Sequence, residues 1–245
     1  MANLIIDEGN TLCKVAVLDK SEVLCELSAP DFDLSAVVAM VEQYGVERAI
    51  VASTRGGAER ICGELRSKID KVLHFTPQTE VPIEIEYSSR QTLGADRIAV
   101  AVGVVCEMGI KDALVVDMGS AITFDVVESG VFKGGNISLG VAMRFKALHD
   151  YTASLPLCEA VEPNGEFGNS TKEAIEQGVM QGVLYEIEGY VERISAKNAK
   201  INIIFCGGDA ESFVNRIKNA IFAPRKLMFT GLNEILEYNV SKNNI

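Results

Sequence analysis

The sequence predicts an α/β protein whose two halves begin alike. Short apolar runs of strand length alternate with stretches of helical spacing. An apolar strand that ends in Asp-x-Gly occurs twice, at Asp7 and at Asp117. The chain has 245 residues, 48% of them hydrophobic and 23% charged, which is the balance of a globular protein with room for two domains.

The first half is predicted to contain three strands, a helix, a strand and a helix. In chain order these elements cover residues 3–6, 12–18, 22–27, 34–41, 48–52 and 58–69. Turn-forming residues such as Asp19-Lys20-Ser21 separate the first three strands, so the half opens as a meander. This is the element order of a ribonuclease-H-like half.

The second half repeats the opening after a polar connector and a long apolar helix over residues 95–107. The elements that follow are predicted as three strands, a long helix, a strand and a helix. They cover residues 113–116, 121–127, 131–138, 171–196, 201–206 and 211–220. We therefore expect two ribonuclease-H-like domains, residues 1–110 and residues 111–245.

Composition narrows the function classes. The formal net charge of -11 disfavours sequence-independent nucleic-acid binding, which needs clustered basic residues. Six widely spaced cysteines form no Cys-x-x-Cys pair and suit a reducing compartment. The first residues lack the basic segment of a signal peptide, and no apolar run reaches the about 20 residues of a membrane span. The sequence therefore predicts a cytoplasmic protein.

Each Asp-x-Gly has an ordinary interpretation as a hairpin turn. Two copies that open two similarly ordered halves favour phosphate or cation binding instead. A strand end presents Asp7 or Asp117 at the rim of a sheet, and the glycine two residues later lets the backbone approach a phosphate. No Walker or dinucleotide-binding glycine motif is present.

Two further stretches carry candidate site residues. After the strand INIIFC, Gly207 and Gly208 form either an ordinary turn or a close backbone approach to the base or ribose of a nucleotide. In LGADRIAV, Asp96 and Arg97 fall in the first turn of a helix, where an acid complements the helix dipole. The functional alternative makes Asp96 a general base and Arg97 an anion contact.

In this order, the motifs resemble those of the type III pantothenate kinases. The matching segments are Asp7-Glu8-Gly9-Asn10-Thr11, Gly94-Ala95-Asp96-Arg97, Asp117-Met118-Gly119-Ser120-Ala121, Gly134-Gly135-Asn136-Ile137-x-x-Gly140, ALHDYTASLP and GNSTKEAIEQGV. The resemblance implies two domains of the actin-like ATPase type with a nucleotide cleft between them. It also implies a homodimer that phosphorylates pantothenate with ATP, Mg²⁺ and a monovalent cation, K⁺ or NH₄⁺.

The resemblance also implies roles for individual residues. Asp96 is the expected base at the pantothenate hydroxyl, Asp7 lies near Mg²⁺ and Asp117 binds the monovalent cation. The residues expected to contact ATP are Asp7, Gly9, Asn10, Thr11, Lys14, Gly119, Ser120, Gly207 and Gly208. Those expected to line the pantothenate site are Tyr87, Gly94, Ala95, Asp96, Arg97 and Thr171.

Two positions depart from the family pattern: Ser120 stands where Thr is usual, and Leu139 where Pro is usual. The hydroxyl of Ser120 preserves the donor, whereas Leu139 is expected to loosen the loop before Gly140. The competing hypotheses are a sugar kinase of the same superfamily and a non-catalytic nucleotide-binding regulator. His74 and His149 lack metal-ligand spacing, which disfavours a zinc site, and we expect a structural or surface role for His149.

Overall fold

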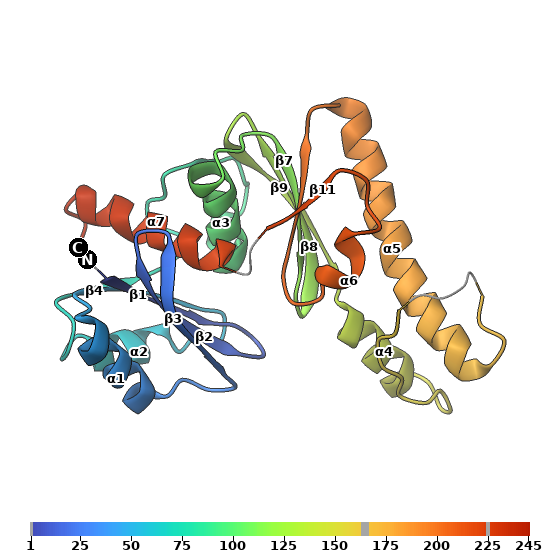
Figure 1. Ribbon diagram of the computed structural model, residues 1–245, viewed down its shortest axis with the longest axis horizontal. Coiled ribbons are helices and arrows are strands. Elements are labelled where there is room, and N and C mark those ends of the chain that lie inside the picture. The colour runs from blue at the N-terminus through green and yellow to red at the C-terminus, as the bar shows by residue number, and fades with distance from the viewer. Residues whose placement is uncertain (1, 163–166, 224–225) are drawn as a thin grey trace. The chain divides into compact units, whose positions relative to one another are not determined.

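The computed structural model describes residues 2–162, 167–223 and 226–245. By internal contacts the chain forms two compact units (Figure 1). Unit 1 comprises Met1–Lys111, Glu128–Lys133 and Lys226–Ile245, and unit 2 comprises Asp112–Val127 and Gly134–Arg225. The division into domains 1–110 and 111–245 stays a prediction.

Unit 1 is built on a five-stranded sheet in the order β3-β2-β1-β4-β5. Strands β1 to β3 are antiparallel neighbours, whereas β4 and β5 continue the sheet in parallel. Its elements are β1 (Ala2–Glu8), β2 (Cys13–Asp19), β3 (Glu22–Ala29), α1 (Leu34–Tyr44), β4 (Arg48–Ser53), α2 (Ala58–Leu65) and β5 (Lys71–His74). The predicted meander and the strand and helix order of this half are confirmed.

The two faces of this sheet are covered by different helices. Leu4 and Ile6 pack in one core with residues of α1 and α2. Alternation along β1 directs Asn3 and Asp7 to the opposite face, which α3 (Ala95–Val102) and α7 (Leu227–Ser241) cover in Figure 1. Asp7 therefore lies on the sheet face that carries the helix with Asp96.

Helix α7 was not predicted from the sequence. A buried polar network anchors it, because the Asn3 amide donates to Asn233 Oδ1 at 2.8 Å and to Glu237 Oε1 at 2.7 Å. A Cβ on Gly231 would lie 1.8 Å from the carbonyl oxygen of Ala99, so only glycine allows α7 to cross α3 this closely. These contacts return the end of the chain to its first strand.

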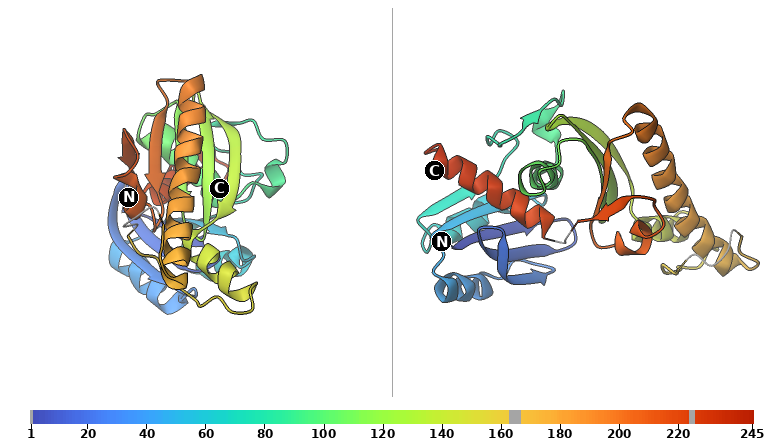
Figure 2. Two further views of the ribbon diagram at one scale, coloured as in Figure 1. Left: turned by 90° about the vertical axis from the view of Figure 1, so that its right-hand side faces the viewer. Right: turned by 45° about the horizontal axis from the view of Figure 1, so that its top comes forward.

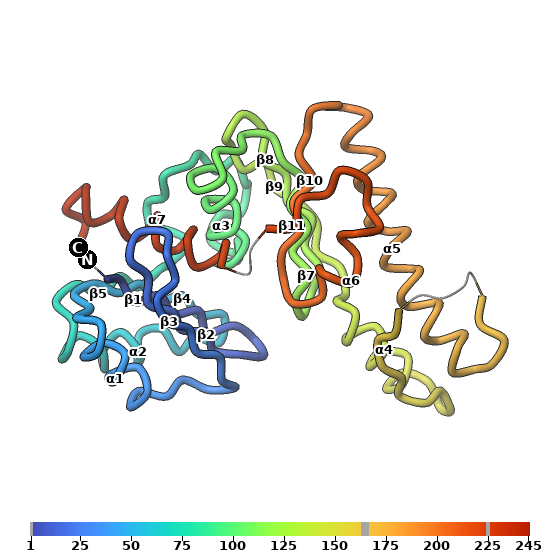
Figure 3. The backbone as a smooth tube through the Cα atoms, in the orientation of Figure 1, coloured from blue at the N-terminus to red at the C-terminus, as the bar shows by residue number. Residues whose placement is uncertain are grey.

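Unit 2 is built around the second sheet, in which its strands follow the order β11-β10-β7-β8-β9, and Figures 2 and 3 follow its chain path. The short strand β6 (Glu84–Ile85) pairs with Val131 and Phe132 at the start of β9, and these residues belong, like β6, to unit 1. The other elements are β7 (Ala113–Met118), β8 (Ala121–Glu128), β9 (Val131–Leu139), α4 (Val141–Asp150), α5 (Thr171–Lys197), β10 (Asn202–Cys206), α6 (Glu211–Val214) and β11 (Ala220–Phe222).

Three predicted helices are shorter in the structure, and the one expected over residues 58–69 ends at Leu65. The helix expected over residues 95–107 is α-helical only to Val102 and continues as a π-helical turn over Gly103–Glu107. A Cβ on Gly103 would lie 2.6 Å from the Leu227 carbonyl oxygen, so α7 packs against the chain at this transition. The helix expected over residues 211–220 ends at Val214, and Asn219 adopts a left-handed φ of 60° that leads into β11.

Helix α5 supplies much of the core of unit 2. Its 27 residues bury Val179, Val183 and Ile187, which join the cluster that also contains Phe124, Phe205 and Phe213. Figure 2 shows this helix running across the strands of the same unit. Within the described residues, no helix combines the length and apolar character needed to cross a membrane.

Candidate active site

The first Asp-x-Gly forms the hairpin between β1 and β2. Asp7 pairs with Lys14 in the antiparallel register, and the Gly9 amide donates to the Leu12 carbonyl at 3.0 Å to close the turn. Asp7 is buried, whereas the side chains of Asn10, Thr11 and Lys14 are exposed. The turn thus offers several side-chain donors at its exposed end, as the sequence predicted.

Hydrogen bonds from the end of the neighbouring strand β4 support this hairpin. The Ser53 hydroxyl donates to the buried carboxylate of Glu8, and its oxygen accepts the amide N–H groups of Arg55 and Gly57, both at 3.1 Å. The Thr54 amide donates to the Glu8 carbonyl at 2.9 Å. Sequence reasoning missed this support, because it depends on residues that lie 45 positions apart.

Cys13 lies under the same hairpin, opposite Glu8 in the register. Burial, together with the nearby carboxylates of Glu8 and Asp7, raises the pKa of its thiol to about 11. The thiol therefore stays protonated and acts as a small buried hydrophobe, as expected from the sequence.

The second Asp-x-Gly forms a tighter hairpin between β7 and β8. The Gly119 amide donates to the Ala121 carbonyl at 3.0 Å, and Asp117 pairs with Thr123 in the register. Gly119 and Ser120 are exposed at the tip. Among the described residues, the buried Thr123 Oγ1 atom has no hydrogen-bond partner. Two oxygen-bearing side chains therefore stand opposite each other at the base of this hairpin.

Two glycines from distant segments press against the second hairpin. A Cβ on Gly140 would lie 2.3 Å from the Ser120 carbonyl oxygen and 2.6 Å from that of Gly119. Gly207 has a φ of +93°, and a Cβ there would lie 2.5 Å from Asp117 Oδ1. Gly207 therefore adopts a backbone conformation that favours glycine, and it also lies in close contact with Asp117 and Met118 of the second hairpin. A contact of Gly207 or Gly208 with a nucleotide stays a prediction.

The N-terminus of α3 carries the predicted base. Gly94 is the N-cap, and Asp96 Oδ1 accepts the backbone N–H of Arg97 at 2.8 Å. A Cβ on Gly94 would lie 2.4 Å from Asp96 Oδ1, so glycine leaves room for the carboxylate to fold back over the helix end. The helix-end acid expected from the sequence is confirmed, with its side-chain orientation set by this hydrogen bond.

Arg97 is buried rather than solvated. Its guanidinium carbon lies 5.8 Å from the ring centre of Tyr87 and 5.7 Å from that of Phe132, and the two rings meet edge-on at 6.1 Å. Only 6% of Arg97 is exposed. Within unit 1 the structure thus brings three predicted pantothenate-site residues together: Tyr87, Asp96 and Arg97. Phe132, which sequence reasoning missed, completes the aromatic wall.

Thr171 is the first residue of α5, in unit 2, and it is exposed. Ser170 caps the helix by accepting the Glu173 amide at 3.3 Å, and Glu173 accepts the Asn169 amide at 3.0 Å. This is a capping box shifted by one residue. Helix capping thus accounts for the presence of Ser170 and Glu173 at the start of α5. The contact of Thr171 with pantothenate stays a prediction.

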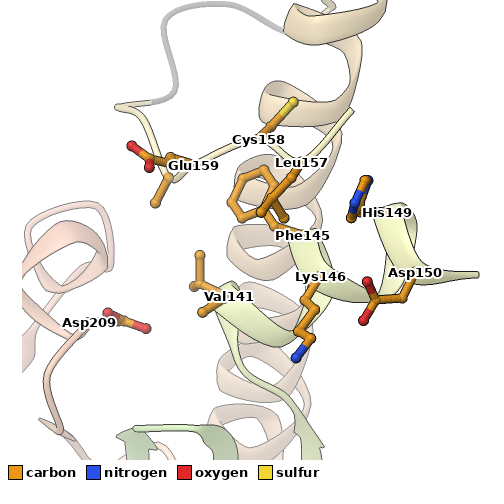
Figure 4. Close-up of a pocket in the computed structure, with 11 residues that line it drawn as sticks. Val141, Phe145, Lys146, His149, Asp150, Leu157, Cys158, Glu159 and Asp209 are labelled. Atoms are coloured by element: carbon orange, nitrogen blue, oxygen red, sulfur yellow. The ribbon is translucent and has the colours of Figure 1, made fainter. Parts of the chain in front are cut away.

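A cavity of about 480 Å³ lies beside the turn after β10 (Figure 4). Val141, Phe145 and Leu157 form apolar walls, and the Asp209 carboxylate points toward the space in Figure 4. Burial raises the pKa of Asp209. The Asp209 amide donates to the Met118 carbonyl at 3.1 Å, so the cavity wall and the second hairpin are joined through the backbone.

His149 borders the same cavity. Its Nδ1 atom lies 2.8 Å from the Leu155 carbonyl oxygen, which fixes the loop after α4. Across the described ranges, no cluster of three or more His, Cys, Asp or Glu side chains has the arrangement of a metal site. Mg²⁺ in kinases is usually held by one or two carboxylates and the substrate phosphates. The single carboxylate of Asp7 at the hairpin fits that kind of site.

The fold of this chain resembles that of known protein structures. A solved structure from Campylobacter jejuni, provisionally assigned to the Baf family of transcriptional activators, matches with a TM-score of 0.63 and 23% identity, over 97% of this chain and 99% of that one. A Listeria monocytogenes protein provisionally named an N-acetylmannosamine kinase matches with a TM-score of 0.55 and 13% identity, over 98% and 100%. Both likenesses show the fold alone, an α/β fold with two mixed sheets.

The sequence comparisons identify the family. The family model described as type III pantothenate kinase matches residues 3–193. The type III pantothenate kinase of Bacteroides fragilis strain YCH46 is 39% identical over 97% of this chain and 98% of its own length. That of Porphyromonas gingivalis strain W83 is 38% identical over 97% and 99%. The chain belongs to the type III pantothenate kinase family.

Proposed function

We propose that this protein transfers the γ-phosphoryl group of ATP to the hydroxyl of pantothenate, giving 4'-phosphopantothenate for coenzyme A synthesis. The observation that carries the proposal is the arrangement at the N-terminus of α3, where Asp96 stands next to Arg97 and its aromatic neighbours. This group lies on the face of the sheet that also carries Asp7. A carboxylate, a buried cation and an apolar wall fit an acceptor with a hydroxyl, a carboxylate and an aliphatic backbone.

Asp96 is the general base. Its Oδ1 atom accepts the Arg97 amide, so the Oδ2 atom is the one that takes the proton from the attacking hydroxyl. In phosphoryl transfer most of the rate enhancement comes from positioning and charge neutralisation, and the base is needed only as the new bond to phosphorus forms. Gly94 leaves the space in which this carboxylate and the hydroxyl approach each other.

Arg97 and Tyr87 hold the other end of pantothenate. Arg97 is a buried residue, 6% exposed, and its guanidinium is faced by two aromatic rings, so the group is poorly hydrated and its attraction for a carboxylate is strengthened. Ala95 forms the adjacent first turn of the helix, and Thr171 contributes a hydroxyl from α5. This set orients the acceptor so that its hydroxyl meets Asp96.

The two hairpins bind the phosphates of ATP. Gly9 and Gly119 allow close backbone approach, while Asn10, Thr11, Lys14 and Ser120 add donors that are exposed at the turns. Asp7 fits a role beside Mg²⁺, which when bound neutralises phosphate charge. Gly207 and Gly208 follow β10, next to the cavity, which suits the base or ribose side of the nucleotide.

Asp117 is the proposed ligand of a monovalent cation. The support is the pairing of Asp117 with Thr123, whose buried hydroxyl oxygen lacks a hydrogen-bond partner among the described residues. Potassium sites in proteins are built from oxygen ligands. A carboxylate and an unsatisfied hydroxyl on one face of a strand pair fit K⁺ or NH₄⁺, and the cation offsets phosphate charge at the second hairpin.

A homodimer is part of the proposal. Exposed apolar side chains occur on β9, α4 and α5 of unit 2: Ile137, Leu139, Met143 and Tyr185. Exposed apolar surface is a feature of protein contacts, and we propose that these residues meet the partner subunit. Thr171 begins the same helix α5, so a dimer through this face suits a contribution of Thr171 to a shared site. Six free cysteines suit the reducing conditions of the cytoplasm, where we place the enzyme.

The test is an ADP-release assay with pantothenate in KCl, with the product identified by mass spectrometry. We expect 4'-phosphopantothenate, and much less of it when NaCl replaces KCl. A panel of hexoses and N-acetylhexosamines is the matched control. Turnover of a sugar without turnover of pantothenate would overturn the proposal in favour of a sugar kinase. ATP binding without turnover of any acceptor would favour a nucleotide-binding regulator.

A further inference from the structure

The junction between β9 and α4, at Gly140, packs directly against the second hairpin. Gly140 is buried at this junction, and its backbone lies directly under the carbonyl groups of Gly119 and Ser120. There is no space for even a methyl group between them, because a Cβ on Gly140 would approach the Ser120 oxygen to 2.3 Å. Any displacement of this junction is therefore transmitted to the hairpin backbone.

Arg144 holds the junction from the first turn of α4. Its Nε atom donates to the Leu139 carbonyl at 2.9 Å, and its Nη2 atom donates to the Ser138 hydroxyl at 3.1 Å. Its backbone N–H also donates to the Gly140 carbonyl at 3.0 Å. The side chain of Arg144 thus fixes Ser138 and Leu139, and its backbone fixes Gly140, at the position where Leu139 was expected to leave a loose loop.

The other side of the Arg144 guanidinium is anchored to α5. Nη2 also donates to Glu186, and the two side chains are only 20% and 25% exposed, so water screens this ion pair incompletely. Glu186 precedes the fully buried Ile187 in the middle of a 27-residue helix. The anchor therefore lies on a helix that packs into the core of unit 2, and Arg144 connects that helix to the junction.

We propose that Arg144 is a positioning residue for ATP: through its bonds to Ser138, Leu139 and Glu186 it fixes Gly140 and hence the phosphate-binding hairpin at Gly119 and Ser120. The inference rests on the proposed role of that hairpin in binding ATP. Preorganised backbone donors cost no rearrangement when charge arrives, so a hairpin that shifts loses affinity for phosphates. Pantothenate contacts in unit 1 do not depend on this junction.

The test compares ATP and pantothenate binding in Arg144→Leu, Arg144→Lys and Glu186→Gln. We expect Arg144→Leu to weaken binding of a non-hydrolysable ATP analogue, measured by calorimetry, by about tenfold, the change that corresponds to one charge-assisted hydrogen bond. The KM for pantothenate is expected to change by less than about twofold. Lysine keeps the charge but not the planar fork, so Arg144→Lys should fall between leucine and wild type.

Arg60→Leu is the matched control, since it removes another Arg–Glu pair, Arg60–Glu64, from unit 1, far from any predicted site residue in sequence. It should leave ATP binding unchanged. Size-exclusion chromatography of each variant separates loss of assembly from loss of affinity. If Arg144→Leu does not fold, Glu186→Gln decides: we expect a smaller but measurable loss of ATP affinity with an unchanged pantothenate KM.

Unchanged ATP affinity in a folded Arg144→Leu, or equal losses for ATP and pantothenate, would overturn the inference. The proposed function fails by a different result, namely a wild-type protein that binds ATP but does not phosphorylate pantothenate. Calorimetry with the ATP analogue does not depend on the acceptor, so the role of Arg144 is measurable in that case too.

Discussion

The two Asp-x-Gly hairpins look alike in sequence but are supported in different ways. The first is an open turn, closed between Gly9 and Leu12, and it carries its own exposed donors, among them Lys14. The second is a tighter turn, closed between Gly119 and Ala121. Its exposed tip offers a ligand mainly backbone groups, together with the side-chain hydroxyl of Ser120.

The supports differ as well. The neighbouring strand β4 holds the first hairpin through hydrogen bonds to Glu8. The second is wedged between two glycines, Gly140 and Gly207, that come from opposite ends of unit 2. The comparison teaches that one motif can be supported in two ways. In the proposed function the open hairpin binds phosphates through its side chains, and the closely packed hairpin binds them through a fixed backbone.

The largest effects expected to distinguish the two hairpins come from their aspartates, Asp7 and Asp117. Asp7→Asn should lower kcat/KM by about 10²- to 10³-fold, because it removes the carboxylate proposed to lie beside Mg²⁺. Asp117→Asn should instead abolish the activation by KCl. Steady-state kinetics with varied MgCl₂ and KCl separate these outcomes. Equal losses with an unaltered KCl response would mean that the two hairpins do not divide these roles.

The glycines test the difference in packing. Gly207→Ala should destabilise the protein by about 1–3 kcal/mol, because the new methyl group overlaps the second hairpin and the φ of +93° is strained for alanine. Gly9→Ala should cost less, since its nearest neighbour is the Leu12 carbonyl at 3.3 Å. Chemical denaturation measures both. A larger cost at Gly9 would contradict the comparison.

The donors test the difference in chemistry. Lys14→Met should raise the KM for ATP by about tenfold, because a cation at the turn interacts with phosphate, and the effect should shrink as salt rises. Ser120→Ala should raise it by only about threefold, since backbone groups supply most of the second hairpin's contacts. Initial rates at two ionic strengths give both values. A larger rise in the KM for ATP with Ser120→Ala than with Lys14→Met would contradict this division between side-chain and backbone contacts.

The smallest expected effect concerns the thiol under the first hairpin. The pKa of Cys13 is raised from 9.0 to about 11 in the folded state, so folding favours the protonated thiol. This stabilisation is complete below pH 9.0 and is lost as the pH rises toward about 11. Thermal midpoints of wild type and Cys13→Ala should therefore converge over this range. Parallel curves would show that Cys13 does not titrate differently on folding.

Local patterns predicted the hairpins and the N-terminus of α3 because alternation, Asp-x-Gly turns and helix starts are set by neighbouring residues. Glycine at positions 140 and 207 was recognised as part of a motif, but the reason lies in contacts with Ser120 and Asp117 that no local pattern contains. The link from Arg144 to Glu186 spans 42 residues and was equally inaccessible. Such contacts depend on how the strands and helices pack together.

The same limit explains the errors in the elements. Helix α7 joins the first unit through Asn3 and Glu237, which are 234 residues apart, and its amphipathic sequence alone gave no signal of that packing. The helix predicted over residues 211–220 was too long because β11 pairs with β10 after Asn219. Strand pairing overrode the helical spacing. No local pattern indicated that Arg97 is buried, and only the fold shows the aromatic rings around it.

The most direct test of the account is a single-turnover experiment with Asp96→Asn in KCl, ATP and pantothenate. The account predicts that both substrates bind with nearly unchanged affinity and that formation of 4'-phosphopantothenate slows by about 10²- to 10⁴-fold, the contribution of a positioned general base. Product formation at the wild-type rate would contradict the central claim that the carboxylate at the N-terminus of α3 activates the acceptor hydroxyl.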